Sequence, residues 1–192
     1  MTLPSFLEKN NWLYKFGLML ISFCFYLGTF ELSNLLPEQF KYDDWISLVF
    51  LPAGSKLILI LLFGFWGTIG DIFALALMAT QFFDTQPFWV CFLYAAISGF
   101  ASFYGVNLAR NILRISVNLS EIQFIHLPVI CLVGNLVHGF ITMLLLYYLN
   151  VVTLDKFWAD TFAMIFGDFF GSFIFIMFFW LGLKIYKRLN YS

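Results

Sequence analysis

Long apolar runs, separated only by short polar connections, occupy almost the whole chain and constrain its fold more than any other feature. Only helices and closed barrels satisfy every backbone polar group inside a bilayer. These runs are continuous, whereas barrel strands alternate over about ten residues. Hydrophobic residues make up 62% of the 192 residues and charged residues 11%, against about 45–50% and 25% in soluble domains. The sequence therefore predicts an all-α, polytopic membrane helix bundle.

The apolar runs divide into six predicted membrane spans, because a span needs about 20 residues. Short connections use up the rest of the chain, so we expect a single integral membrane domain over residues 1–192. The second and third spans follow each other at once across the tight stretch "GFWG". The predicted spans are about 12–30, 45–65, 67–83, 88–108, 124–149 and 158–183.

Lysines and arginines gather in the connections that six spans would place on one side of the membrane. These residues are enriched in cytoplasmic loops, so both termini are predicted to be cytoplasmic. The basic side carries Lys9, Lys15, Arg110, Arg114, Lys184, Lys187 and Arg188.

Charge and cysteine content exclude two classes of function. The net charge is −1 and there is no basic block, so nucleic acid is not an expected partner. The three cysteines, Cys24, Cys91 and Cys131, lie scattered in apolar runs without CxxC or Cys/His spacing. Neither a metal site nor a cofactor is therefore expected.

Lys56 is the first of several polar residues predicted to lie at membrane depth. A charge at the bilayer centre costs about 2.5–3.5 kcal/mol on insertion scales, and such residues mark sites. Lys56 follows "LPAGS", in which Pro52 disturbs the preceding turn and Gly54 permits a close approach. These three residues are expected to form the wall of a site. The alternative is a kinked helix whose Lys56 reaches a lipid headgroup.

Asp168 lies near the middle of the last predicted span, in "FGDFFGSF". Its depth should be similar to that of Lys56, so we expect the two to form an ion pair that lines a shared hollow. Gly167 and Gly171 form a G-x-x-x-G pattern that lets another helix approach closely. The alternative is a pair that fixes packing only, without a ligand.

Three further polar residues complete the predicted ligand-binding set. Asp71, in "GTIGDIF", is expected to be a second partner for Lys56 or for Arg110. Asn135 and His138 are three residues apart and share a helix face, and His138 could titrate near neutral pH. The predicted set is Lys56, Asp71, Asn135, His138 and Asp168.

Hydrolase motifs give no support for an enzyme, because G-x-S-x-G and H-E-x-x-H are both absent. A serine–histidine dyad could be built from Ser98 or Ser102 with His138, but nothing near either serine prepares it as a nucleophile. The sequence therefore predicts a protein that is not an enzyme.

The order of the short motifs resembles the membrane-associated sensor domains of bacterial signalling proteins, the MASE type. "LPAG" opens a span, a glycine-rich turn leads directly into "GTIGDIF", and "GNLVHGF" and "FGDFFGS" follow over about residues 46–176. The resemblance implies a sensor module in a bacterial inner membrane. Sensors of this type usually have about eight spans and a fused effector domain, and this chain departs from them because we expect a short, stand-alone module without an effector domain. It places the motif positions of the family on Pro52, Gly54, Asn135, His138, Gly167, Asp168 and Gly171.

Three functions are compatible with these features. The first is a sensor-like module that binds a small ligand or a proton in an intramembrane polar pocket and signals to a separate cytoplasmic or membrane partner. The second is the substrate-binding membrane component of an energy-coupling-factor-like transporter. The third is a structural or assembly protein. The lipid bilayer is the expected surrounding in all three, and a homo-oligomer is left open.

Overall fold

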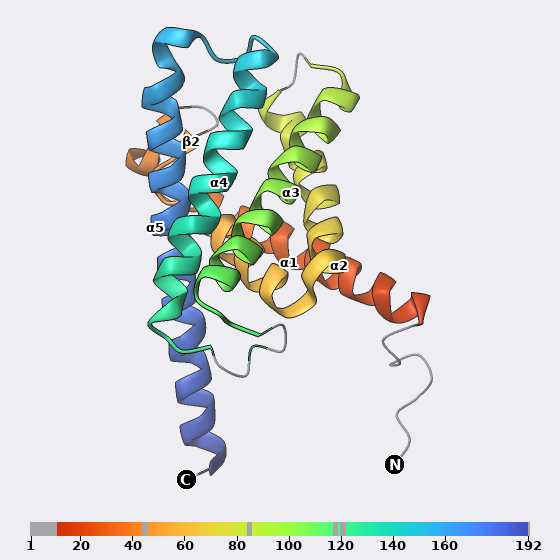
Figure 1. Cartoon of the computed structure of the whole chain (residues 1–192), viewed down its shortest axis with the longest axis vertical. Coiled ribbons are helices and arrows are strands. Elements are labelled where there is room, and N and C mark those ends of the chain that lie inside the picture. Colours follow the sequence, from red (N-terminus) through yellow and green to blue (C-terminus); the bar gives the residue numbers. More distant parts are fainter. Residues whose placement is uncertain (1–10, 44–45, 84–85, 117–118, 120–121, 192) are drawn as a thin grey trace.

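The computed structural model of the chain describes residues 11–43, 46–83, 86–116, 119 and 122–191, with the backbone alone for residues 183–184 and 186–191. The described part forms five α-helices, one 3₁₀ turn and a two-stranded antiparallel ribbon (Figure 1). In chain order these are α1 (Trp12–Asn34), η2 (Glu38–Phe40), β1 (Lys41–Asp43), β2 (Ile46–Ser47), α2 (Leu51–Phe82), α3 (Phe88–Ile112), α4 (His126–Tyr148) and α5 (Leu154–Tyr191).

All five of these helices are long and apolar enough to cross a membrane, α5 over Leu154–Gly182. Large apolar side chains cover their outer surfaces, among them Leu20, Phe73, Phe166 and Phe178. Such surfaces are unsuited to water and suited to lipid. The chain is therefore an integral, multi-pass membrane protein, and the predicted all-α membrane bundle is confirmed.

The prediction of six separate spans is not reproduced. The predicted spans 45–65 and 67–83 both fall largely within α2, which runs from Leu51 to Phe82. Gly64, in the "GFWG" stretch, has φ 58° and ψ −132°, so α2 is kinked there. Only glycine adopts this backbone conformation readily. Figure 1 shows the two arms of α2 meeting at this bend, with the second arm rising beside α3.

The bend brings the two arms of α2 back onto each other. A Cβ added to Gly67 would lie 2.7 Å from the carbonyl oxygen of Leu59, eight residues earlier in the chain. A straight helix of 32 residues would be about 48 Å long, well beyond a hydrocarbon core of about 30 Å. The kink therefore shortens the element and lets both arms pack inside the bundle.

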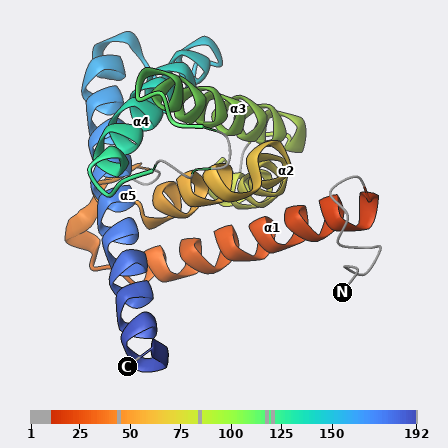
Figure 2. The same ribbon diagram turned by 60° about the horizontal axis from the view of Figure 1, so that its bottom comes forward.

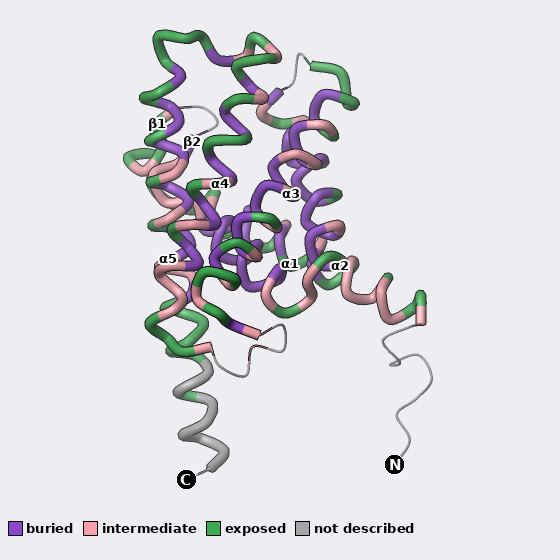
Figure 3. The backbone as a smooth tube through the Cα atoms, in the orientation of Figure 1, coloured by how far each residue is buried: buried purple, intermediate pink, exposed green. Residues whose placement is uncertain are grey.

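The first arm of α2 lies at the centre of the fold. Every residue from Leu51 to Ile60 is buried, and α2 packs against α1, α3 and α5. Figure 3 shows this buried centre, and Figure 2 shows α1 lying along the first arm. Polar side chains on this arm are consequently shielded from lipid by neighbouring helices.

Pro52 occupies the first turn of α2 and does not kink it. A proline is well suited to this position, because its missing N–H would have no partner within the helix anyway. The expected disturbance at Pro52 is therefore wrong, and Lys56 lies in the second turn of the helix. The break that the sequence places near Pro52 lies instead at Gly64.

Glycines hold the start of α2 against α5. The Phe50 N–H donates a 3.1 Å hydrogen bond to the Gly167 carbonyl oxygen. A Cβ on Gly171 would overlap the main chain of Phe50, and one on Gly167 would overlap the carbonyl oxygen of Ser47. Gly167 and Gly171 thus pack against the segment that precedes α2. The sequence predicts that another membrane helix packs there.

Gly54 makes the corresponding close approach from α2. A Cβ added there would lie 2.6 Å from the Cβ of Phe175 and 2.9 Å from the Cα of Ser172. A side chain at position 54 would therefore push α2 and α5 apart.

Candidate functional site

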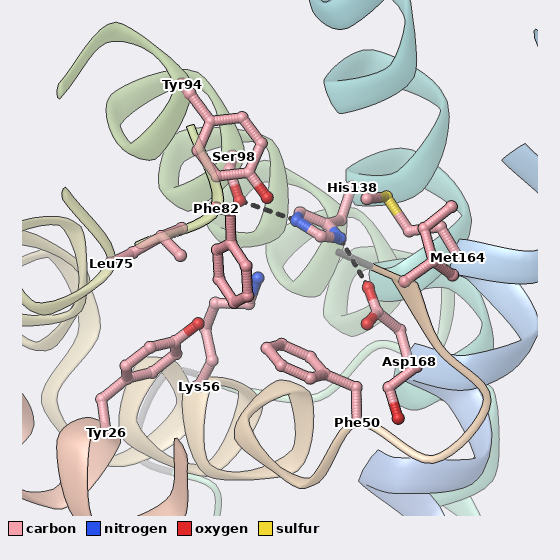
Figure 4. Close-up of a pocket in the computed structure, with 12 residues that line it drawn as sticks. Tyr26, Phe50, Lys56, Leu75, Phe82, Tyr94, Ser98, His138, Met164 and Asp168 are labelled. Atoms are coloured by element: carbon pink, nitrogen blue, oxygen red, sulfur yellow. Dashed lines mark hydrogen bonds and ion pairs between the residues drawn. The ribbon is translucent and has the colours of Figure 1, made fainter. Parts of the chain in front are cut away.

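A small cavity lies where all five described helices and strand β2 come together. Its volume is about 40 Å³, which is room for a few waters and well below the roughly 150 Å³ of a cavity that holds benzene. Figure 4 shows the cavity from inside the bundle. The lining residues are Tyr26, Ile46, Ser47, Phe50, Lys56, Leu75, Phe82, Tyr94, Ser98, His138, Met164 and Asp168.

A chain of hydrogen bonds crosses one side of the cavity and joins α5, α4 and α3. The Oδ2 atom of Asp168 lies 2.8 Å from Nδ1 of His138. The Nε2 atom of His138 lies 2.7 Å from Oγ of Ser98. These partners fit a neutral imidazole whose Nδ1–H donates to the carboxylate and whose Nε2 accepts the serine hydroxyl proton. All three side chains are buried.

The expected ion pair between Lys56 and Asp168 is not present. Both residues line the same cavity, but the carboxylate of Asp168 is bonded to His138. Among the described residues no carboxylate oxygen lies within 4.0 Å of the Lys56 Nζ atom. The Lys56 side chain is 2% exposed, so it does not reach a lipid headgroup either. Its amine points into the cavity (Figure 4).

Asp71 is buried on the second arm of α2 but does not line the cavity. Both of its carboxylate oxygens lack a hydrogen-bond partner, and it forms no ion pair with Lys56 or Arg110. The prediction that Asp71 pairs with one of these two bases is therefore wrong. An ionised carboxyl without a partner is strongly disfavoured in an apolar interior. Asp71 is therefore a buried carboxyl group whose two oxygens both lack a hydrogen-bond partner.

Asn135 forms a hydrogen bond inside the helix bundle and does not line the cavity. Its Nδ2 donates to Oγ of Ser172 at 3.1 Å, which links α4 to α5. Its Oδ1 is buried without a partner. Asn135 and His138 share a face of α4, as the sequence predicts, and both turn toward α5. Only His138 reaches the cavity.

Two tyrosines at the cavity were not singled out from the sequence. Tyr26 comes from α1 and Tyr94 from α3. The Tyr26 hydroxyl is buried and has no hydrogen-bond partner. With 9 tyrosines and 27 phenylalanines in the chain, no spacing distinguishes these two from the aromatic residues that only pack or face lipid.

Comparison with known proteins gives no relative: no family model, curated protein or solved structure matches this chain. The resemblance to MASE-type sensor domains therefore stays a prediction, based on the short motifs and their order. The function has to be argued from the site itself.

The chemistry open to the site is set by its groups and its size. Aspartate, histidine and serine are bonded in the order that activates a serine nucleophile in hydrolases. Acyl transfer also needs room for a substrate and donors for an oxyanion, whereas Ser98 is fully buried and the cavity volume is about 40 Å³. Within the described ranges no three His, Cys, Asp or Glu side chains are grouped to hold a metal ion. The cavity therefore offers buried polar groups and a small volume, but no room for a large substrate.

Proposed function

We propose that this protein is a sensor-like membrane module that binds a small ligand or a proton in its intramembrane pocket and signals to a separate partner. The observation that carries the proposal is the composition of the cavity wall. Every one of the five described helices contributes to it, and it is faced by the buried Lys56, whose Nζ has no carboxylate oxygen of the described residues within 4.0 Å. A ligand that binds one arrangement of these helices more tightly than another shifts the protein toward that arrangement.

Helix α5 is the element best suited to carry such a change out of the membrane. It holds Asp168 at the cavity and continues as one helix to Tyr191, past the end of the predicted span at about residue 183. Figure 1 shows its last turns extending past the rest of the bundle. A shift of Asp168 along or around the helix axis would therefore move the C-terminal turns as well.

For the topology we propose that the two arms of α2 are the second and third of six spans, with both termini in the cytoplasm of a bacterium. The basic residues Arg110 and Arg114, and the group formed by Lys184, Lys187 and Arg188, support this orientation. The membrane would be the bacterial inner membrane, as the resemblance to MASE-type domains implies. Cysteine labelling from either side of the membrane, at single sites in the loops, would test the orientation.

The functional test is a deletion strain complemented with variants of the pocket. The wild type and the control variant Lys15→Met, whose lysine lies over the Trp66 ring and outside the cavity, are expected to restore the signalling phenotype. The double variant Lys56→Met with Asp168→Asn is expected to accumulate in the membrane, to retain its partner on purification, and to fail to signal.

Three other outcomes would contradict the proposal. A folded and fully active double variant would show that the polar groups only fix packing, as in the structural reading. Loss of solute uptake, without loss of a signal, would favour the transporter component. A deletion that alters no signalling pathway, together with no co-purifying partner, would remove the basis for a sensor.

A further inference from the structure

The class of ligand follows from which hydrogen-bonding groups of the cavity are already used. On the α4 and α5 side, the Asp168 carboxylate accepts the Nδ1–H of His138 at 2.8 Å. The Nε2 of the same ring is bonded to Ser98 at 2.7 Å. The Oδ2 atom of Asp168 and both ring nitrogens of His138 are therefore engaged with other side chains of the protein.

The donors on the opposite side are not engaged. The Lys56 ammonium carries three N–H groups, and no carboxylate oxygen of the described residues lies within 4.0 Å of its Nζ. The Tyr26 side chain is 1% exposed, and its hydroxyl has no partner. Tyr94 adds a second phenol to the lining. In Figure 4 the Lys56 amine and the two tyrosine side chains approach the same part of the cavity.

We propose that this cavity binds a small monovalent anion, a halide or a one-carbon carboxylate, on Lys56 with Tyr26 and Tyr94 as further donors. This inference names the ligand class of the site described under the proposed function, and it rests on that function for its biological role. The anion accepts hydrogen bonds from an ammonium that no carboxylate oxygen of the described residues approaches within 4.0 Å. It also accepts the hydroxyl proton of Tyr26, which otherwise has no acceptor.

The cavity volume and the buried Lys56 ammonium favour a small anion over larger acids, cations and a single proton. A volume of about 40 Å³ is well below the roughly 150 Å³ of a cavity that holds benzene, so an aromatic acid would have to displace the helices. A metal or organic cation would lie beside the Lys56 ammonium, while the Asp168 carboxylate across the cavity is already bonded to His138. A single proton would leave the Tyr26 hydroxyl and the lysine N–H groups without partners.

The test measures anion-dependent stability of the purified full chain in lipid nanodiscs. Thermal unfolding is followed while sodium gluconate, which is too large for the cavity, is replaced by sodium chloride or sodium formate at constant ionic strength. For the wild type we expect a saturable rise in Tm with chloride or formate and no rise with gluconate. Isothermal titration with formate gives the Kd independently.

Two pocket variants and two matched controls locate the binding. Lys56→Met is expected to abolish the saturable rise, and Tyr26→Phe, which removes one hydrogen bond, to raise Kd about tenfold. The controls Lys15→Met and Tyr104→Phe change the same residue types outside the cavity and should keep the Kd of the wild type.

The inference is overturned if the wild type shows no saturable response to chloride or formate, or if Lys56→Met keeps that response. It is also overturned if Tyr26→Phe, which should fold in any case, binds formate as tightly as the wild type. These results are separable from the proposed function. If the wild type binds no anion but Lys56→Met loses signalling, the anion inference is wrong and the sensor proposal stands with a different ligand. If the wild type binds anions but the pocket variants still signal, the sensor proposal is wrong and the anion inference stands.

Discussion

Replacement of Gly171 by alanine is the most direct test of how the site is held together. Gly171 faces the main chain of Phe50, and a Cβ at this position would overlap the carbonyl oxygen of that residue. The obstacle is backbone, so no side-chain rotation can relieve it. The matched control is Gly182→Ala on the same helix, where an added Cβ meets nothing within 4 Å.

The size of the effect can be worked out from these contacts. Overpacking of this kind costs about 1–3 kcal/mol. Moving the Ser47–Phe50 segment away from α5 would also break the hydrogen bond from Phe50 to Gly167, which adds about 1 kcal/mol. The greater helix propensity of alanine offsets about 1 kcal/mol of this loss in the free energy of unfolding. We therefore expect Gly171→Ala to lower the free energy of unfolding by about 1–3 kcal/mol, whereas Gly182→Ala should raise it by about 1 kcal/mol.

The assay is reversible unfolding in mixed detergent micelles, followed by far-ultraviolet circular dichroism and repeated for the wild type and both variants. The expected gap between the two alanine variants is about 2–4 kcal/mol, or roughly 30- to 1,000-fold in the unfolding equilibrium constant. Equal stability of Gly171→Ala and Gly182→Ala would refute the reasoning, because it would mean that α5 does not pack against the Phe50 backbone.

Four further outcomes are expected. Gly64→Ala should lower stability by about 1–3 kcal/mol, since φ 58° with ψ −132° is a glycine conformation; unchanged stability in the same unfolding assay would speak against the bend. Asp71→Asn removes a buried carboxyl that has no partner and should not lower stability; a loss above about 1 kcal/mol would reveal a stabilising interaction of the carboxylate. A double-mutant cycle of His138→Ala with Asp168→Asn should give a coupling of about 0.5–1.7 kcal/mol, and zero coupling would contradict the 2.8 Å contact. Ser98 should not react with a fluorophosphonate probe; stoichiometric labelling lost in Ser98→Ala would make the protein a serine hydrolase.

The membrane fold could be predicted because hydropathy reports burial in lipid directly. The boundaries could not, and the start of α2 shows why. The apolar stretch from Ile46 to Phe50 reads as part of a span, yet Ile46 and Ser47 form strand β2 and the helix begins at Leu51. An apolar extended segment buried against another helix has the same hydropathy as helix. The bend at Gly64 was foreseen as a tight turn, but not as a kink inside one element.

The candidate site was predicted in part. Lys56, His138 and Asp168 do line one cavity, because a buried charged or titratable residue in a membrane bundle faces the protein interior. The pairing among them was wrong. Span edges are uncertain by about four residues, which is about 6 Å along a helix, whereas an ion pair needs contact within about 4 Å. Depth estimated from sequence therefore cannot choose between His138 and Lys56 as the partner of Asp168.

The bend at Gly64 makes the cavity sensitive to very small rotations. Lys56 lies on the first arm of α2 and Leu75 on the second, and both line the cavity. They are about 12 Å and 16 Å from the bend along the two arms. A pivot of about 5° at this single hinge would change the width of the cavity by about 1 Å, which is the difference between a formed and a broken hydrogen bond. A substitution at this one glycine, about 12 Å along the helix from Lys56, would therefore be felt in the pocket.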